Sequence, residues 1–193
     1  MPVSYGFLSS PEPLPEDISN NTTLEYFMRD SDFVRVIENR TDGTIRFRKD
    51  NRICECRADK SSALKEAKSF GISLEEGKHL DVMVRFLSEL DPGSAIMFST
   101  VTDLSANTEA ALYLYRRMDK EGINLRFIKE PWLNNELYKS ARRECGEIDN
   151  VIQSVFRATY ESIDYQNSYI ALLCRSESNE AKKNGQEKLS EQN

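Results

Sequence analysis

The hydrophobic and polar positions of this chain form two kinds of local pattern. Short apolar or alternating runs, which are typical of strands, are separated by segments whose apolar residues recur every three or four positions, as in amphipathic helices. Strand, helix and strand over residues 95–128 predict a right-handed crossover between parallel strands. We predict strands over residues 3–8, 33–37, 44–48, 52–57, 95–100 and 123–128, and helices over residues 22–29, 61–71, 74–90 and 108–122.

A hairpin adds antiparallel strands to this crossover. Asp42-Gly43 is a hairpin turn signal, and alternating residues follow it on both sides of a second turn at residues 50–51. The fold class is therefore α/β: a mixed, mostly parallel sheet flanked by helices. We expect this α/β domain to extend over residues 1–146.

A longer helical pattern begins at Ile148. Apolar residues recur there at spacings of three and four as far as Leu173, and no proline or glycine lies between Gly146 and Gly185. This predicts one long C-terminal helix, or two helices in line, over residues 147–176. Its apolar stripe is wider than a lone exposed helix keeps, so we expect it to pack on the domain or on a second copy. Residues 177–193 are polar and predict a disordered tail.

The composition narrows the classes of function. Of the 193 residues, 30% are charged and 39% are hydrophobic, and the net charge is −6. This balance disfavours a free-standing nucleic-acid-binding protein, which needs clustered lysines and arginines. No apolar run approaches the ~18 residues of a membrane span, and the first residues lack the pattern of a signal peptide. We therefore expect a cytoplasmic protein with no membrane partner.

The cysteines match neither a disulfide scaffold nor a metal site. Cys54 and Cys56 share one face of a predicted strand, which suits either half of a metal site or two small residues on a buried face. Because no second ligand pair is present and His79 is the only histidine, we expect no metal and no other cofactor.

The order of several short motifs resembles a known family. Residues 80–134 contain a helix ending at Pro92-Gly93, a strand, the loop TDLSANT, a helix, and a strand ending at Glu130-Pro131-Trp132. The N-terminal stretch YGFLSS, residues 5–10, follows the frame Tyr-x-Arg-Val-Ser-(Ser/Thr). In this order and spacing the chain resembles the catalytic domain of the serine recombinases, the resolvase/invertase group. It resembles a degenerate member that lacks the C-terminal DNA-binding domain.

The resemblance implies a resolvase-like fold and a specific reaction. In that reaction a serine hydroxyl attacks a DNA phosphodiester and forms a phosphoserine link to DNA. Ser9 takes the position of this nucleophile, and the helix from Ile148 takes the position of the family's dimerisation helix. Arginines stabilise the charge of the transition state in such sites, because their planar guanidinium groups match phosphate.

The arginine positions of the family hold other residues here. Phe7, Asp103 and Ala106 stand where arginines are expected, and Thr102 stands where the family has an aspartate. Losing one such donor typically costs about 3 kcal/mol of transition-state stabilisation, so three losses are expected to abolish strand transfer. Ser9 then has a second interpretation, as a polar residue at the end of a strand.

Arginines in the predicted hairpin could restore the missing charge. Arg46, Arg48 and Arg52 are candidate phosphate contacts, unless they alternate outward onto a solvated face. The favoured hypothesis is a catalytically inactive, dimerising or regulatory module of DNA recombination. Its partner would be a second copy or a related recombinase, with weak DNA binding at most. The alternatives are an active strand-exchange or nicking enzyme that uses Ser9 with relocated arginines, and an interaction or inhibitor protein of a mobile element without a DNA role.

Overall fold

A mixed sheet of six strands forms the centre of the fold, as expected for the α/β class. The computed structural model describes residues 3–10, 33–39, 43–50, 52–144 and 147–190. By its internal contacts the chain divides into two units, Met1–Gln153 and Ser154–Asn193. The strands are β1 (Ser4–Ser10), β2 (Phe33–Asn39), β3 (Thr44–Lys49), β4 (Arg52–Arg57), β5 (Ala95–Phe98) and β6 (Asn124–Phe127).

The strand order across the sheet is β4-β3-β2-β1-β5-β6. Strand β1 pairs in parallel with both β2 and β5, and β5 pairs in parallel with β6. The hairpin strands β3 and β4 are antiparallel and form one edge of the sheet. The predicted parallel crossover and the predicted antiparallel hairpin are both confirmed.

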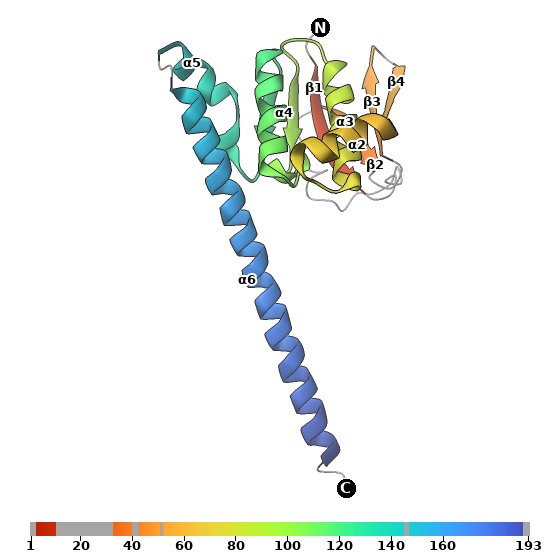
Figure 1. Ribbon diagram of the computed structural model, residues 1–193, viewed down its shortest axis with the longest axis vertical. Coiled ribbons are helices and arrows are strands. Elements are labelled where there is room, and N and C mark those ends of the chain that lie inside the picture. The colour runs from red at the N-terminus through yellow and green to blue at the C-terminus, as the bar shows by residue number, and fades with distance from the viewer. Residues whose placement is uncertain (1–2, 11–32, 40–42, 51, 145–146, 191–193) are drawn as a thin grey trace. The chain divides into compact units, whose positions relative to one another are not determined.

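The helices α2, α3 and α4 cover one face of this sheet (Figure 1). Side-chain oxygens of Asp59, Ser73 and Asn107 cap their N-termini by accepting backbone N–H groups. Gly71 ends α2 with a positive φ of 63°, a conformation in which glycine avoids the strain of a side chain. The described helices before Ile148 are α2 (Lys60–Phe70), α3 (Leu74–Ser88), α4 (Thr108–Lys120) and α5 (Glu136–Glu144). The 3₁₀ turns η1 (Val101–Asp103) and η2 (Pro131–Leu133) precede α4 and α5.

The core lies between these helices and the sheet. Phe47 and Phe86 meet edge to face with their ring centroids 5.0 Å apart, and Tyr5 contacts both rings. Phe7 and Phe98 pack at 5.0 Å on the same side of the sheet. Alternation along β1 therefore directs Tyr5, Phe7 and Ser9 toward the face of the sheet that the helices cover.

Three sequence predictions differ from the structure. The strand predicted over residues 95–100 ends at Phe98, because η1 begins three residues later at Val101, and α5 was not predicted. The disordered tail predicted over residues 177–193 is wrong as far as Ser190, because α6 (Ile148–Ser190) continues through it as one helix. That segment is polar but rich in lysine, glutamate, glutamine and alanine, which are strong helix formers. The helix predicted over residues 22–29 lies outside the described residues.

Candidate functional site at the carboxyl edge of the sheet

The strand order places a topological switch point between β1 and β5. The chain proceeds from β1 to β2 on one side, whereas β5 and β6 extend the sheet on the other side. In parallel α/β sheets, ligands bind in the crevice outside the carboxyl ends of the strands at such a point. Ser9 lies near the carboxyl end of β1, and the TDLSANT loop follows β5. The fold therefore brings these two predicted elements to the same edge.

Two carboxylates fasten the loop that follows β5. The buried carboxylate of Glu130, which follows β6, accepts the Thr100 hydroxyl at 3.0 Å and the Val101 backbone N–H at 2.9 Å. The Asp103 carboxylate accepts the Thr100 backbone N–H at 3.1 Å. Both acids thus satisfy donors at the start of η1, where the backbone N–H groups have no partner within the turn itself.

A buried histidine holds the other side of this loop. The Nε2 atom of His79, on α3, lies 2.8 Å from the carbonyl oxygen of Leu104. Because a carbonyl oxygen can only accept, Nε2 carries the proton of this hydrogen bond. Within the loop, Leu104 and Ser105 are buried. His79 therefore positions the loop from the helix layer, a role that its sequence neighbours do not indicate.

The end of the loop begins α4. The Ser105 hydroxyl accepts the Asn107 N–H at 3.1 Å, and the Asn107 side chain accepts the Ala110 N–H at 3.0 Å. This is the local geometry of a helix N-cap, for which asparagine is among the preferred residues. The polar residues of TDLSANT thus shape the turn and start the next helix.

Ser9 is half-buried and lies opposite Glu38 of β2 in the parallel register. Its side chain leaves the sheet on the same face as Phe7, the face that the helices cover. Phe7 is only 1% exposed and packs on Phe98. The aromatic residue at the expected arginine position is therefore part of the hydrophobic core.

The loop positions carry little charge. Between residues 99 and 108 the only charged residue is Asp103, and there is no lysine or arginine. Thr102 and Asp103 are half-buried, whereas Ala106 is exposed. The loop therefore contributes one negative charge and no positive charge to this edge of the sheet.

The hairpin arginines lie elsewhere on the sheet. Arg46 and Arg48 are exposed on the face of β3 opposite to the buried Ile45 and Phe47, and the Arg46 Nε atom is 3.2 Å from Glu55 Oε1. Through the strand register Arg46 is aligned with Leu8 rather than with Ser9, so its side chain leaves the opposite face from that of Ser9. Strand β2 separates β3 from β1, a distance of roughly 10 Å.

Arg52 lies farther away, on the edge strand β4, where it pairs with Lys49. The structure therefore places Ser9 at the same edge of the sheet as the loop residues, whereas Arg46, Arg48 and Arg52 lie on strands farther across the sheet. The two residues that hold the loop, Glu130 and His79, are additional site residues. The Glu-Pro motif marks Glu130 in the sequence, but not what its carboxylate contacts.

The described residues contain no group of three or more histidine, cysteine or acidic side chains arranged to hold a metal ion. Among the described helices, none combines the length and apolarity needed to cross a membrane. No protein-family model matches this chain, and no curated protein matches its sequence.

Proposed function

We propose that this protein is a resolvase-like module of DNA recombination that does not itself cleave DNA and that acts by dimerising with a second copy or with a related recombinase. The observation that carries this proposal is the charge of the loop at the switch point. Two carboxylates hold the loop, and no basic residue lies between residues 99 and 108. A phosphoryl transition state needs positive charge at this point.

The long helix supports a dimerising role. Along α6, a heptad repeat places mainly apolar residues at its two core positions, with a serine at one of them, as in a coiled coil. Tyr165 and Tyr169 belong to this repeat and are 72% and 54% exposed. Burying each such side chain against a partner helix would contribute about 1.5–3 kcal/mol. The repeat consists of Ile148, Val151, Val155, Ala158, Ser162, Tyr165, Tyr169 and Leu172.

Covalent capture on DNA tests the inactive part of the proposal. The full chain is incubated with a supercoiled plasmid and with labelled random-sequence duplexes, and protein–DNA adducts are sought on denaturing gels. Neither the native chain nor the Ser9→Ala variant is expected to form an adduct. An adduct that forms with the native chain and disappears in Ser9→Ala would show an active recombinase and refute the proposal.

Sedimentation equilibrium tests the dimer separately. The native chain is expected to dimerise, and Y165E/Y169E is expected to be monomeric, because it places two charges in the apolar repeat. The matched control is N167E/A171E, which adds the same two negative charges at exposed positions on the opposite side of α6 and should leave the dimer intact. A monomeric native chain that also forms no complex with a recombinase would contradict the dimerising role.

A further inference from the structure

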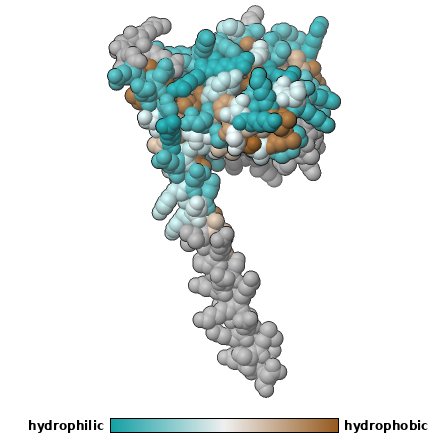
Figure 2. All heavy atoms as spheres, viewed as in Figure 1, coloured by the Kyte–Doolittle hydropathy of each residue, from teal (hydrophilic) through white to brown (hydrophobic). Residues whose placement is uncertain are grey.

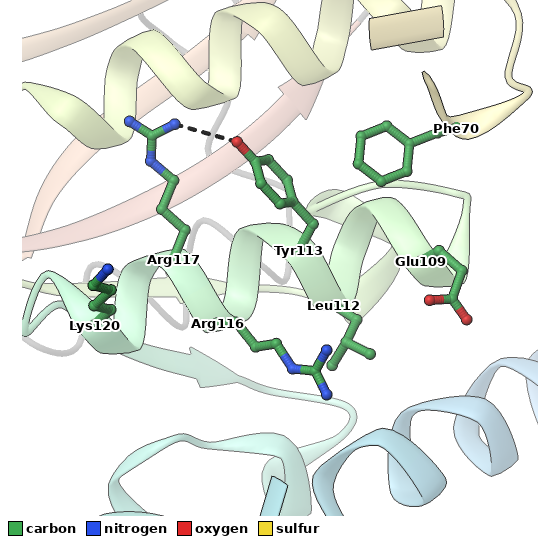
Figure 3. A pocket seen from close by; sticks show the side chains of 7 residues that line it. All are labelled: Phe70, Glu109, Leu112, Tyr113, Arg116, Arg117 and Lys120. Carbon is green, nitrogen blue, oxygen red and sulfur yellow. Dashed lines mark hydrogen bonds between the residues drawn. The ribbon is translucent and has the colours of Figure 1, made fainter. Parts of the chain in front are cut away.

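A groove lies on the outer side of α4, next to the end of α2 (Figure 3). Its volume is about 540 Å³, within the range of sites that receive a ligand or part of a partner. On the face of the molecule in Figure 2, hydrophobic residues appear as small patches between hydrophilic ones. The groove is lined by Phe70, Glu109, Leu112, Tyr113, Arg116, Arg117 and Lys120.

Two aromatic rings form the apolar part of this α4 groove. The rings of Phe70 and Tyr113 are 5.6 Å apart, and Tyr113 is 38% exposed. Arg117 holds Tyr113 in place, because it donates to the Tyr113 hydroxyl at 3.4 Å, to Ser88 Oγ at 2.9 Å and to the Glu121 carboxylate at 3.0 Å. The groove therefore presents an apolar surface whose tyrosine is held in one position.

Two further cations of the groove are not neutralised by an acid. Arg116 and Lys120 are one helical turn apart on α4, where like charges repel each other. Arg116 donates to the neutral Gln153 side chain at 3.3 Å, and Lys120 makes no hydrogen bond or ion pair with the part of the chain that the structure describes. The only acid of the groove, Glu109, lies at the other end of α4.

We propose that the α4 groove binds an acidic segment of a partner protein. An aromatic or aliphatic side chain of that segment would pack on Phe70 and Tyr113, and its carboxylates would pair with Arg116 and Lys120. Tyrosine and arginine are enriched at such interfaces, and rigid aromatic anchors provide most of their affinity. A DNA backbone fits less well, because it needs a row of cations along a polar surface. This inference is independent of the α6 repeat.

Fluorescence anisotropy tests the inference with the full chain. The probes are two labelled peptides of one length, in which a central Leu-Phe pair is flanked by glutamates in the first and by glutamines in the second. Saturable binding is expected for the glutamate peptide, and binding of the glutamine peptide should be roughly tenfold weaker or more. The variant R116E/K120E should lose binding to the same extent, and the neutral R116Q/K120Q should show an intermediate loss.

The matched control is K60E/K65E on α2, which changes the net charge by the same amount at exposed positions outside the groove. It should bind the glutamate peptide as the native chain does, and circular dichroism checks that all variants are folded. Absence of saturable binding, or equal loss in both charge-reversal variants, would overturn the proposal. Two other results would overturn it by identifying another occupant: tighter binding of a DNA duplex that depends on Arg116 and Lys120, or self-association that R116E/K120E abolishes.

Discussion

Removing the carboxylate of Glu130 should break the hydrogen bonds that hold the loop following β5 at the switch point. This side chain is buried and accepts both the Thr100 hydroxyl and the Val101 N–H, from a position about 30 residues later in the chain. Val101 is itself fully buried, so its N–H cannot reach water when the acceptor is lost. Glu130→Ala is therefore expected to destabilise the first unit strongly.

The expected magnitude follows from the two hydrogen bonds. An unsatisfied buried N–H costs about 1–3 kcal/mol, and a lost hydrogen bond to a charged group costs about 1.5–3 kcal/mol. We expect Glu130→Ala to lower the free energy of unfolding by about 3–5 kcal/mol. Glu130→Gln should lose roughly 1–2 kcal/mol, because an amide can accept the Val101 N–H and donate to the Thr100 hydroxyl, without the charge.

Urea unfolding followed by circular dichroism measures both variants. The control is Glu136→Ala, which breaks an exposed ion pair with Arg126 and should cost at most about 1 kcal/mol. The reasoning would be refuted if Glu130→Ala cost no more than Glu136→Ala. It would also be refuted if Glu130→Gln were as damaging as Glu130→Ala, because the charge itself would then dominate.

Three further predictions concern the elements around the site. Asn107→Ala removes the cap of α4 and should cost about 1 kcal/mol in urea unfolding, and a cost near zero would contradict the capping role. Gly77→Ala should cost about 1–3 kcal/mol of unfolding free energy, because the added Cβ would lie 2.4 Å from the backbone oxygen of Ala63. Gly71→Ala has open space around its Cβ, so it should cost only the roughly 1 kcal/mol of a side chain at a positive φ. Burial raises the pKa of Cys56 to about 11, so at pH 8 only about one thiol in a thousand is ionised; peptide mapping after brief alkylation should show Cys56 much less modified than the exposed Cys174, and equal modification would contradict this.

The sequence was sufficient to predict the elements whose pattern is local. The alternation along β3 and β4 and the apolar spacing in α3 and α4 reflect burial on one face, which is what periodicity records. The buried residues of α4 include Ala111, Leu114, Tyr115 and Met118, which lie on one face of the helix as the spacing predicts. The parallel pairing of β1 and β5 then places Ser9 and the TDLSANT loop at one edge, because parallel strands end at the same edge of a sheet.

The contacts between distant residues could not be predicted in this way. His79 and Leu104 are 25 residues apart, and only the packing of α3 against the loop brings them together. Whether Arg46 and Ser9 lie on the same face of the sheet depends on the strand register, because a shift of the register by one residue moves every side chain of a strand to the other face. The tail was predicted to be disordered from its polarity, whereas helix propensity depends on side-chain type and not on polarity alone.

The positions where the chain departs from the expected recombinase pattern have different structural roles. Asp103 is part of the loop's own hydrogen bonding, because its carboxylate accepts the Thr100 N–H. An arginine cannot take over this role, since its guanidinium has donors and no acceptor. Ala106, in contrast, is exposed and accepts no hydrogen bond through its side chain. A phosphate-binding loop would therefore need a new acceptor for the Thr100 N–H as well as new arginines, which is consistent with the non-catalytic role proposed above.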